Sequence, residues 1–300
     1  MQNKTEKIAS THLGKKSTGS LSYDPSLLVP IPRNENRELY KIDNDNLPFL
    51  GVDVWHAYEF SCLTSNGLPV TRVIKLKYNS DSEYLIESKS LKLYLNSFNM
   101  SSFGQTIDDC LEICKSIIEK DLSNALKTEV SINFLTDDTK RVQIFDEFEN
   151  ILNFVDTNKL KIEKFKESPQ LLELELLSDE KEYYLTFDSL RSNCRVTHQP
   201  DFGDIFIYYK SNHHIKEDSL VKYLCSFRSE FHFHEECCEM IYKRLYDVLN
   251  INQNGDLFVC ALYTRRGGID ICPVRWSKDC KNMAVTLIDT AQYARKSIKQ

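Results

Sequence analysis

The chain repeats one motif, first as Ser90-Leu91-Lys92-Leu93-Tyr94-Leu95-Asn96-Ser97-Phe98 and again as Ser219-Leu220-Val221-Lys222-Tyr223-Leu224-Cys225-Ser226-Phe227. The two copies share six of nine residues at a constant offset of 129. Each copy follows a strand-like run and precedes an amphipathic segment. A match of this size can arise by chance, but the shared context favours an internal duplication. We therefore expect two related halves.

Strand-like runs and helix-like segments surround the two copies. The runs 74–78, 130–134 and 172–176 alternate between apolar and polar residues, which predicts strands with one wet face. Two segments place apolar residues on one helical face: Ile107, Leu111, Cys114, Ile117 and Ile118 in the first, and Cys237, Ile241, Leu245 and Val248 in the second. Antiparallel strands followed by helices, repeated, predict an α+β fold with helices layered on one sheet face.

Composition divides the chain into three parts. Residues 1–45 are rich in Lys, Ser, Asn and Pro, and predict an extended arm. The acidic stretch from Asp137 to Pro169 would join the two halves. We therefore expect an arm at 1–45, a first module at 46–165 and a second module at 166–300.

Composition also excludes several classes of function. The net charge of -6 and the lack of a basic tract argue against direct nucleic-acid binding. No apolar run reaches the length of about 20 residues that spans a bilayer. The first 20 residues lack the apolar core of an export signal, so we expect a cytoplasmic protein whose ten cysteines stay reduced. None of the nine glycines forms a Rossmann or P-loop fingerprint.

One segment places a cysteine and a carboxylate seven residues apart: Ser192-Asn193-Cys194-Arg195-Val196-Thr197-His198-Gln199-Pro200-Asp201. A thiol is a strong nucleophile only as the thiolate, and a nearby acid or base can manage its proton. The alternative is a buried cysteine followed by a turn aspartate, since Pro-Asp is common in turns. In the first half Cys62 lies near the matching place, but Pro69 stands where the acid would be. The second half alone therefore carries the pair.

The second amphipathic segment opens with Phe231-His232-Phe233-His234-Glu235-Glu236-Cys237-Cys238. His234 would donate protons near neutral pH, and Glu235 would accept paired hydrogen bonds from an amidine-like edge. Glu236 is explained by a favourable interaction with the helix N-terminus. An alternative is a zinc site, although the spacing is not a familiar closed pattern, from His232, His234, Cys237 and Cys238.

Two basic motifs suit a phosphate-rich ligand. The first is Glu87-Ser88-Lys89-Ser90-Leu91-Lys92-Leu93-Tyr94, with two lysines three apart and two hydroxyls. The second is Arg265-Arg266-Gly267-Gly268. The alternative is a solvated helix face for the first motif and a solvated turn for the second.

Together these motifs resemble those of the long, two-module NADPH-dependent 7-cyano-7-deazaguanine reductases, the nitrile reductases of queuosine biosynthesis. The resemblance runs from Tyr23-Asp24-Pro25 to Ile269-Asp270 and adds Tyr263-Thr264 before the Arg-Arg-Gly-Gly motif. It implies two tandem tunnelling-fold modules, each an antiparallel sheet with helices on one face. Such a fold fits the missing Rossmann fingerprint, because NADPH must then be held in another way.

The resemblance also implies a role for each motif. Cys194 would attack the nitrile carbon to form a covalent thioimide, which accepts hydride more readily than a nitrile. Asp201 and His234 would transfer protons. Substrate contacts would come from Glu235, Phe233 and Glu87. NADPH contacts would come from Ser88, Lys89, Ser90, Lys92, Arg265, Arg266 and Gly267, without a choice of which basic residue meets the ribose phosphate. No metal is expected.

The expected partners are the small deazaguanine substrate, NADPH as co-substrate and a second copy of the chain in a homodimer. Two rival functions remain at this stage. One is a zinc-dependent purine-ring hydrolase of the same fold, as in GTP cyclohydrolase I. The other is a non-catalytic protein that binds deazapurines.

Overall fold

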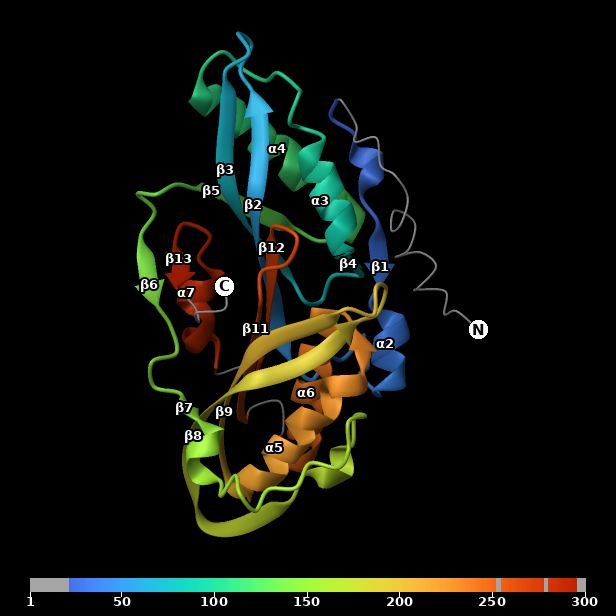
Figure 1. Ribbon diagram of the computed structural model, residues 1–300, viewed down its shortest axis with the longest axis vertical. Coiled ribbons are helices and arrows are strands. Elements are labelled where there is room, and N and C mark those ends of the chain that lie inside the picture. The colour runs from blue at the N-terminus through green and yellow to red at the C-terminus, as the bar shows by residue number, and fades with distance from the viewer. Residues whose placement is uncertain (1–21, 252–254, 278–279, 296–300) are drawn as a thin grey trace.

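The computed structural model describes residues 22–251, 255–277 and 280–295 (Figure 1). In chain order, with η for a 3-10 helix, the elements are η1 (Pro25–Leu27), β1 (Pro30–Pro32), α2 (Asn34–Leu39), β2 (Leu50–Leu63), β3 (Pro69–Asn79), β4 (Tyr84–Ile86), α3 (Ser88–Asn96), α4 (Ile107–Leu126), β5 (Val130–Leu135), β6 (Arg141–Gln143), β7 (Glu149–Asn150), η2 (Ile151–Phe154), η3 (Pro169–Leu171), β8 (Leu174–Cys194), β9 (Pro200–Ile215), α5 (Glu217–Cys225), η4 (Ser226–Ser229), β10 (Phe231–His232), α6 (His234–Val248), β11 (Asp256–Tyr263), β12 (Ile269–Trp276), η5 (Lys281–Ala284), α7 (Val285–Ile288) and β13 (Tyr293–Arg295). Among these helices, none has the length and apolar character needed to cross a lipid bilayer.

Strands from both halves form one continuous sheet in the order β10-β8-β9-β11-β12-β2-β3-β5. Neighbours along this path are antiparallel except β10, which runs parallel to β8, as does β7. The halves meet where β12 pairs with β2, in a register from Ile269↔Ala57 to Trp276↔Leu50. The predicted α+β class is confirmed, with the two halves sharing a single sheet.

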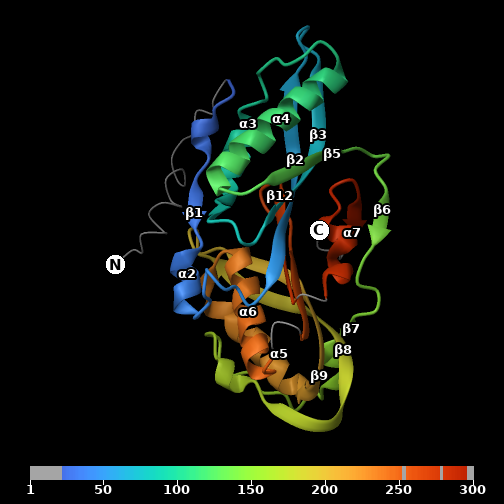
Figure 2. The same cartoon turned by 180° about the vertical axis from the view of Figure 1, so that it is seen from behind.

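The long helices cover one face of this sheet (Figures 1 and 2). In the first half α4 buries a stripe against the strands, formed by Cys110, Cys114, Ile118, Leu122 and Leu126. Its N-terminus is fixed by a capping box between Thr106 and Asp109. In the second half α5 and α6 pack in the same way. The opposite face carries β6, α7 and β13, beside a third apolar cluster.

The repeated motif forms equivalent helices, α3 and α5, and its serines explain why. The hydroxyl of Ser90 donates to the carbonyl oxygen of Glu87 at 2.7 Å, and Ser219 donates to that of Lys216 at 2.7 Å. Each serine also accepts a backbone N–H from a segment that precedes its helix. The matching tyrosines and leucines are buried in the two cores. The repeat therefore preserves a helix start and its packing.

The N-terminal arm, as far as it lies within the described residues, contacts both halves. β1 pairs with β4 of the first half. Further along, Arg37 in α2 donates to Glu239 of α6 at 2.7 Å. Ile31, which is fully buried, lies in an apolar cluster that includes Val196 and Phe233 of the second half. Residues 1–21 of the predicted arm lie outside the described residues.

The predicted elements agree with the structure except at their edges. The run 172–176 was expected to be a strand throughout, but β8 begins only at Leu174, because Pro169 to Leu171 form a 3-10 turn. The expected connection from Asp137 to Pro169 is not a plain linker. It contributes β6, which pairs with β13, and β7, which pairs with β8.

Candidate active site

A tight hairpin carries Cys194 at the end of β8. The N–H of Cys194 donates to the carbonyl oxygen of Gln199 at 2.8 Å. His198 closes the turn with a φ of 57° and donates its N–H to the Cys194 carbonyl at 2.9 Å. Across the strands, Ser192 pairs with Asp201. Because side chains two apart on a strand face the same way, Cys194 and Asp201 lie on one face of the sheet.

The equivalent hairpin of the first half corrects one sequence alignment. The last paired residues before the turns are Leu63↔Pro69 and Asn193↔Pro200. Thr64 therefore occupies the position of Cys194, and Val70 occupies that of Asp201. Cys62, which pairs with Val70, therefore matches Ser192 and lies two residues before the position of Cys194. The first half still lacks both the thiol and the acid.

The surroundings of the Cys194 thiol favour its ionised form. The residue is 6% exposed, and burial by itself raises the pKa of the thiol. The Thr197 hydroxyl, the N–H groups of Thr197 and Val196, and the Arg266 guanidinium all donate to the sulfur, and they hold the pKa of Cys194 below its ordinary value. The thiolate is the nucleophilic form of cysteine, so this hairpin presents an activated nucleophile.

Asp201 lies between His234, which donates a hydrogen bond, and the cationic Arg266. Its Oδ2 is 3.2 Å from Nε2 of His234, and its Oδ1 forms an ion pair with Arg266. Burial opposes ionisation, but the hydrogen bond from His234 and the charges of Arg266 and Lys89 hold the pKa of Asp201 below its ordinary value. The side chain is therefore a carboxylate at neutral pH.

His234, the first residue of α6, is held by stacking on Tyr263, with ring centroids 3.9 Å apart and planes 9° from parallel. Burial lowers the pKa of the imidazole, and the nearby charges of Arg266 and Lys89 add to this effect. The ring is therefore neutral at neutral pH and donates its Nε2–H to Asp201. Its Nδ1 has no hydrogen-bond partner among the described residues, so it can accept a proton.

Glu235 and Phe233 flank His234 at the start of α6. Glu235 is 1% exposed, and its Oε1 has no hydrogen-bond partner in the described part of the chain. Burial, aided by the negative charge of Asp53, raises the pKa of Glu235 to about 8. Phe233 packs in the apolar cluster of the arm and lies under the guanidinium of Arg195, 5.7 Å from the ring centroid. A buried acceptor without a partner is suited to a ligand that brings N–H donors.

The start of α3 supplies the first half's contribution. Glu87 is the N-cap of this helix, and its Oε2 accepts the N–H of Ser90 at 2.7 Å. Ser88 faces the same pocket as Glu87, and half-buried Lys89 is close enough to interact electrostatically with Cys194. Ser90 is not brought to the pocket. It is fully buried, and its hydroxyl is used within the helix start and the arm.

The remaining predicted cofactor residues lie on or near the loop between β11 and β12. Arg266 reaches the pocket, as described above. Lys92 lies outside it and is bound to the carbonyl oxygen of Gly267 at 2.8 Å and to Glu59 at 2.9 Å. Arg265 points away and stacks over Tyr58, 4.0 Å from the ring centroid. The seven predicted cofactor residues therefore do not form one contiguous surface.

One pocket collects the reactive side chains from both halves. Its lining consists of Trp55, Ile86, Glu87, Ser88, Cys194, Asp201, His232, Phe233, His234, Glu235, Arg266 and Ile271. It therefore joins a nucleophile, a carboxylate–imidazole pair and an unpartnered buried glutamate. Such a group can add to an electrophilic carbon, move protons and bind an edge with N–H donors.

Comparison with known proteins gives one consistent result. Residues 20–134 match the family model for the N-terminal part of nitrile reductase, 7-cyano-7-deazaguanine reductase, and residues 200–282 match that of QueF-like proteins. The chain is 38% identical over 280 residues to a protein from Colwellia psychrerythraea, with 92% of this chain and 94% of that protein covered. It is 40% identical over 290 residues to one from Rickettsia felis, covering 96% and 99%. Both relatives are named NADPH-dependent 7-cyano-7-deazaguanine reductase. This chain belongs to the 7-cyano-7-deazaguanine reductase family.

Sequence reasoning missed several residues of this reductase-family pocket. Trp55 and Ile271 carry no sequence signal of a cavity, because a strand buried on both faces does not show which residue lines one. Thr197 was inside the quoted cysteine segment but received no role. The signal was its hydroxyl within three residues of Cys194, where a turn brings donors to the sulfur. Tyr263, which orients His234, was visible only as part of a motif.

The structure does not gather the zinc ligands considered as an alternative for this family member. His232 is bound to Glu230 at 3.2 Å, and the Cys238 thiol donates to backbone carbonyl oxygens. Within the described ranges, the group of His, Cys and acidic side chains close enough to share an ion is His56, Asp270 and Cys272. Asp270 and Cys272 alternate with pocket-lining Ile271 along β12, so they face the other side of the sheet.

Proposed function

We propose that this chain reduces the nitrile of 7-cyano-7-deazaguanine to the aminomethyl group of 7-aminomethyl-7-deazaguanine with NADPH, as the names of its relatives describe. The reaction belongs to queuosine biosynthesis, a tRNA modification pathway. The observation that carries the proposal is the position of Cys194, whose thiol is held toward the thiolate beside Asp201 and His234 in the same pocket as Glu235.

In the proposed mechanism Cys194 forms the bond that activates the nitrile. The thiolate adds to the nitrile carbon, one π bond of the C≡N group breaks, and the nitrogen takes a proton. Asp201 and His234 lie where they can pass that proton, because neutral His234 holds a proton on Nε2 and a free acceptor at Nδ1. The product is a thioimide. The carbon–sulfur bond later breaks and returns the thiolate to Cys194.

Substrate recognition is assigned to the start of α6 and the start of α3. A 7-deazaguanine carries adjacent N–H donors on its amidine edge. Glu235 offers a buried carboxyl whose Oε1 lacks a partner among the described residues, and it would accept these donors. Phe233 would cover the ring, and Glu87 would complete the pocket with the oxygen that does not cap α3.

The residues around the pocket fit NADPH as a co-substrate. Lys89 is half-buried and has no carboxylate within 4.0 Å among the described residues, so its charge is available to a phosphate. Ser88 offers a hydroxyl beside it. Bound NADPH supplies the hydride, and two molecules are needed for each nitrile. We assign Lys89, Ser88 and Arg266 to this role first, with Lys92, Arg265 and Gly267 further from the pocket and Ser90 acting through the helix start.

The architecture completes the proposal. We assign the two halves, 46–165 and 166–300, to tandem tunnelling-fold modules, supported by the equivalent helices α3 and α5. Sheets of this kind associate through their strands, and we propose a cytoplasmic homodimer that contacts neither nucleic acid nor membrane directly. Light scattering coupled to size exclusion tests the dimer, since a monomer mass would contradict it.

One assay separates this function from its rivals. Purified protein is given 7-cyano-7-deazaguanine and NADPH, and the expected result is oxidation of two NADPH for each aminomethyl product. A zinc-dependent hydrolase would consume no NADPH and would lose activity with a chelator. A protein that only binds deazapurines would consume no NADPH, and an alkylating reagent would modify its Cys194 no faster than its other cysteines. Absence of NADPH oxidation would sink the proposal.

A further inference from the structure

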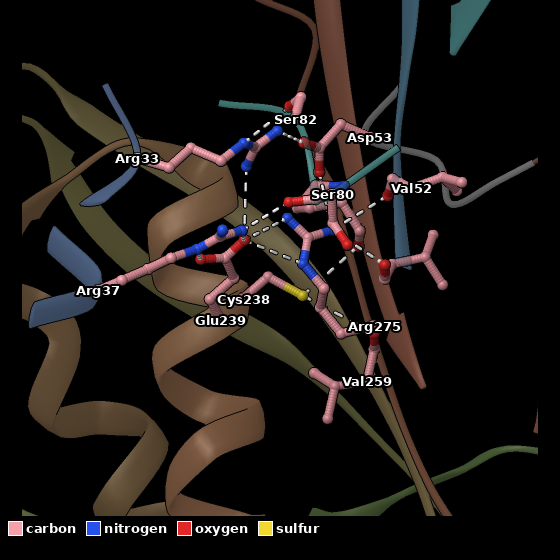
Figure 3. Close-up of polar contacts among 12 residues, drawn as sticks. Arg33, Arg37, Val52, Asp53, Ser80, Ser82, Cys238, Glu239, Val259 and Arg275 are labelled. Carbon is pink, nitrogen blue, oxygen red and sulfur yellow. Dashed lines mark hydrogen bonds and ion pairs between the residues drawn. The ribbon is translucent and has the colours of Figure 1, made fainter. Parts of the chain in front are cut away.

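A cluster of five charged side chains lies buried between the arm, the sheet and α6 (Figure 3). Its members are Arg33, Arg37, Asp53, Glu239 and Arg275, each with a side chain 3% exposed or less. Two arm residues at α2, Arg33 and Arg37, therefore carry positive charge into the interior of the molecule. Burying an ion is costly unless it is paired, so every member should have partners.

The partners form a closed set. Arg275 lies 2.8 Å from Asp53 and 2.9 Å from Glu239. Arg33 bridges the same two carboxylates, at 2.5 Å and 3.4 Å. Arg37 is bound to Glu239 at 2.7 Å and to the carbonyl oxygen of Ser80 at 2.6 Å. Three guanidinium groups thus face two carboxylates, and the cluster carries one excess positive charge.

A carboxyl group that could balance this positive charge lies one helical turn away on α6. Glu235 precedes Glu239 by four residues on α6, so both side chains project from the same side of the helix. Glu239 contacts the cluster, and Glu235 lines the substrate pocket with an oxygen that no described residue satisfies. An ionised Glu235 would make the cluster electrically neutral.

We propose that Arg33, Arg275 and Asp53 are positioning residues for the substrate, because they set the charge of Glu235 and thereby its capacity to bind the amidine edge. This inference rests on the proposed function, in which Glu235 accepts the N–H donors of the deazaguanine. It also gives the N-terminal arm a task, since Arg33 comes from the arm.

The charges around Glu235 shift its pKa in the directions that this proposal requires. Burial and the charge of Asp53 raise its pKa to about 8, while Arg33 and Arg275 oppose the rise. The charged or titratable groups that act on it include Arg33 after β1, Asp53 on β2, Tyr78 on β3 and Arg275 on β12. Its pocket also holds Glu87, Cys194, Asp201, His232, His234 and Arg266. Glu235 is therefore mainly protonated at neutral pH. Two N–H donors favour the carboxylate, so binding releases a proton.

The test measures affinity for 7-deazaguanine, which has the amidine edge and no nitrile, by calorimetry on both sides of pH 8. In the wild type, affinity should fall about tenfold for each pH unit below the midpoint. Asp53→Asn should move the midpoint down by about one unit, and Arg33→Gln should move it up by a similar amount. Arg33→Lys keeps the charge and should restore the wild-type midpoint. Lys243→Gln is the matched control, since this cation lies on α6 but is paired with Asp247 outside the cluster, and it should leave the midpoint in place.

The outcomes separate this inference from the proposed function. Glu235→Gln should abolish the pH dependence. Opposite shifts for Asp53→Asn and Arg33→Gln support the positioning role. Equal loss of affinity at every pH, or midpoints unchanged in both variants, overturns it while NADPH oxidation with the nitrile still upholds the function. If Arg33→Gln does not fold, the isosteric Asp53→Asn decides alone.

Discussion

The imidazole Nε2 of His234 lies 3.2 Å from Oδ2 of Asp201, and the other oxygen of this carboxylate is paired with Arg266. Arg266 also donates to the Cys194 sulfur. A proton that leaves or reaches the reacting nitrogen therefore moves within one connected group, which includes the nucleophile. A change at Asp201 should consequently affect chemistry more than binding.

Asp201→Asn tests that separation. The amide keeps the shape but cannot hold the charge that pairs with Arg266 and His234, so turnover should fall about 10²–10⁴-fold. The dissociation constant for the nitrile should change far less. Steady-state kinetics and calorimetry measure the two quantities. Parallel losses in both would instead identify Asp201 as a structural residue.

Cys194→Ala should abolish the covalent substrate adduct. Wild-type protein incubated with the nitrile and no NADPH should gain the mass of one substrate molecule in intact-protein mass spectrometry. Cys225→Ala serves as the control, because burial raises the pKa of that thiol and its removal should leave the adduct intact. An adduct that persists without Cys194 would place the nucleophile elsewhere.

The pH dependence of thiol alkylation tests the hairpin around Cys194. Donors from Thr197 hold the pKa of Cys194 below its ordinary value. Alkylation should therefore already be fast at pH values below the ordinary pKa of a cysteine. Thr197→Val removes the hydroxyl donor, and the midpoint of the rate profile should move to higher pH. Thr197→Ser keeps the hydroxyl and should leave the midpoint near that of the wild type. Iodoacetamide kinetics over a pH series provide the measurement, and identical profiles for the two variants would contradict this account.

Lys89→Gln should weaken NADPH binding. The half-buried ammonium has no carboxylate within 4.0 Å in the described ranges, so removing it should raise KM for NADPH about tenfold while KM for the nitrile changes little. Lys92→Gln is the matched control, because Lys92 is already bound to Glu59 and Gly267. A larger effect at Lys92 than at Lys89 would reverse our assignment.

Glu239→Gln should lower the free energy of unfolding by about 3–5 kcal/mol, because it leaves Asp53 to balance three buried guanidinium groups. Burial opposes ionisation of Glu239, but Arg37 and Arg275 lower its pKa from 4.5 to about 2. The stabilisation is therefore present above pH 4.5 and is lost as the pH falls toward 2. Urea unfolding across this range should show a steeper acid loss in the wild type than in the variant. Glu112→Gln, at an exposed position of α4, should change neither.

The sequence predicted what depends on local pattern. The two predicted apolar stripes lie on α4 and α6, because helical spacing indicates which face is buried. On α4, however, the buried stripe runs through Cys110, Cys114 and Ile118, and Ile107 is 39% exposed. The repeated nine-residue motif predicted equivalent contexts for α3 and α5. The motifs also brought Cys194, Asp201 and the start of α6 to one pocket, as expected.

Contacts between residues far apart in the chain could not be predicted from local sequence patterns. Arg33 and Arg275 are separated by most of the chain, and an isolated arginine gives no sign that it is buried beside Asp53. Cys62 is the cysteine nearest the predicted position, but the pairing register of the hairpin, which the sequence does not show, places Thr64 there. Ser90 carried the right residue type for a phosphate, but its burial was decided by the arm that packs over it.

The pairing of β2 with β12 has a thermodynamic consequence. Trp55 and Ile271 are cross-strand partners where the two halves meet, and both line the pocket. A ligand in this pocket binds only when the halves are joined. Its binding free energy is therefore added to the free energy that keeps them together, so a saturating ligand should make the whole chain melt later and as one cooperative unit.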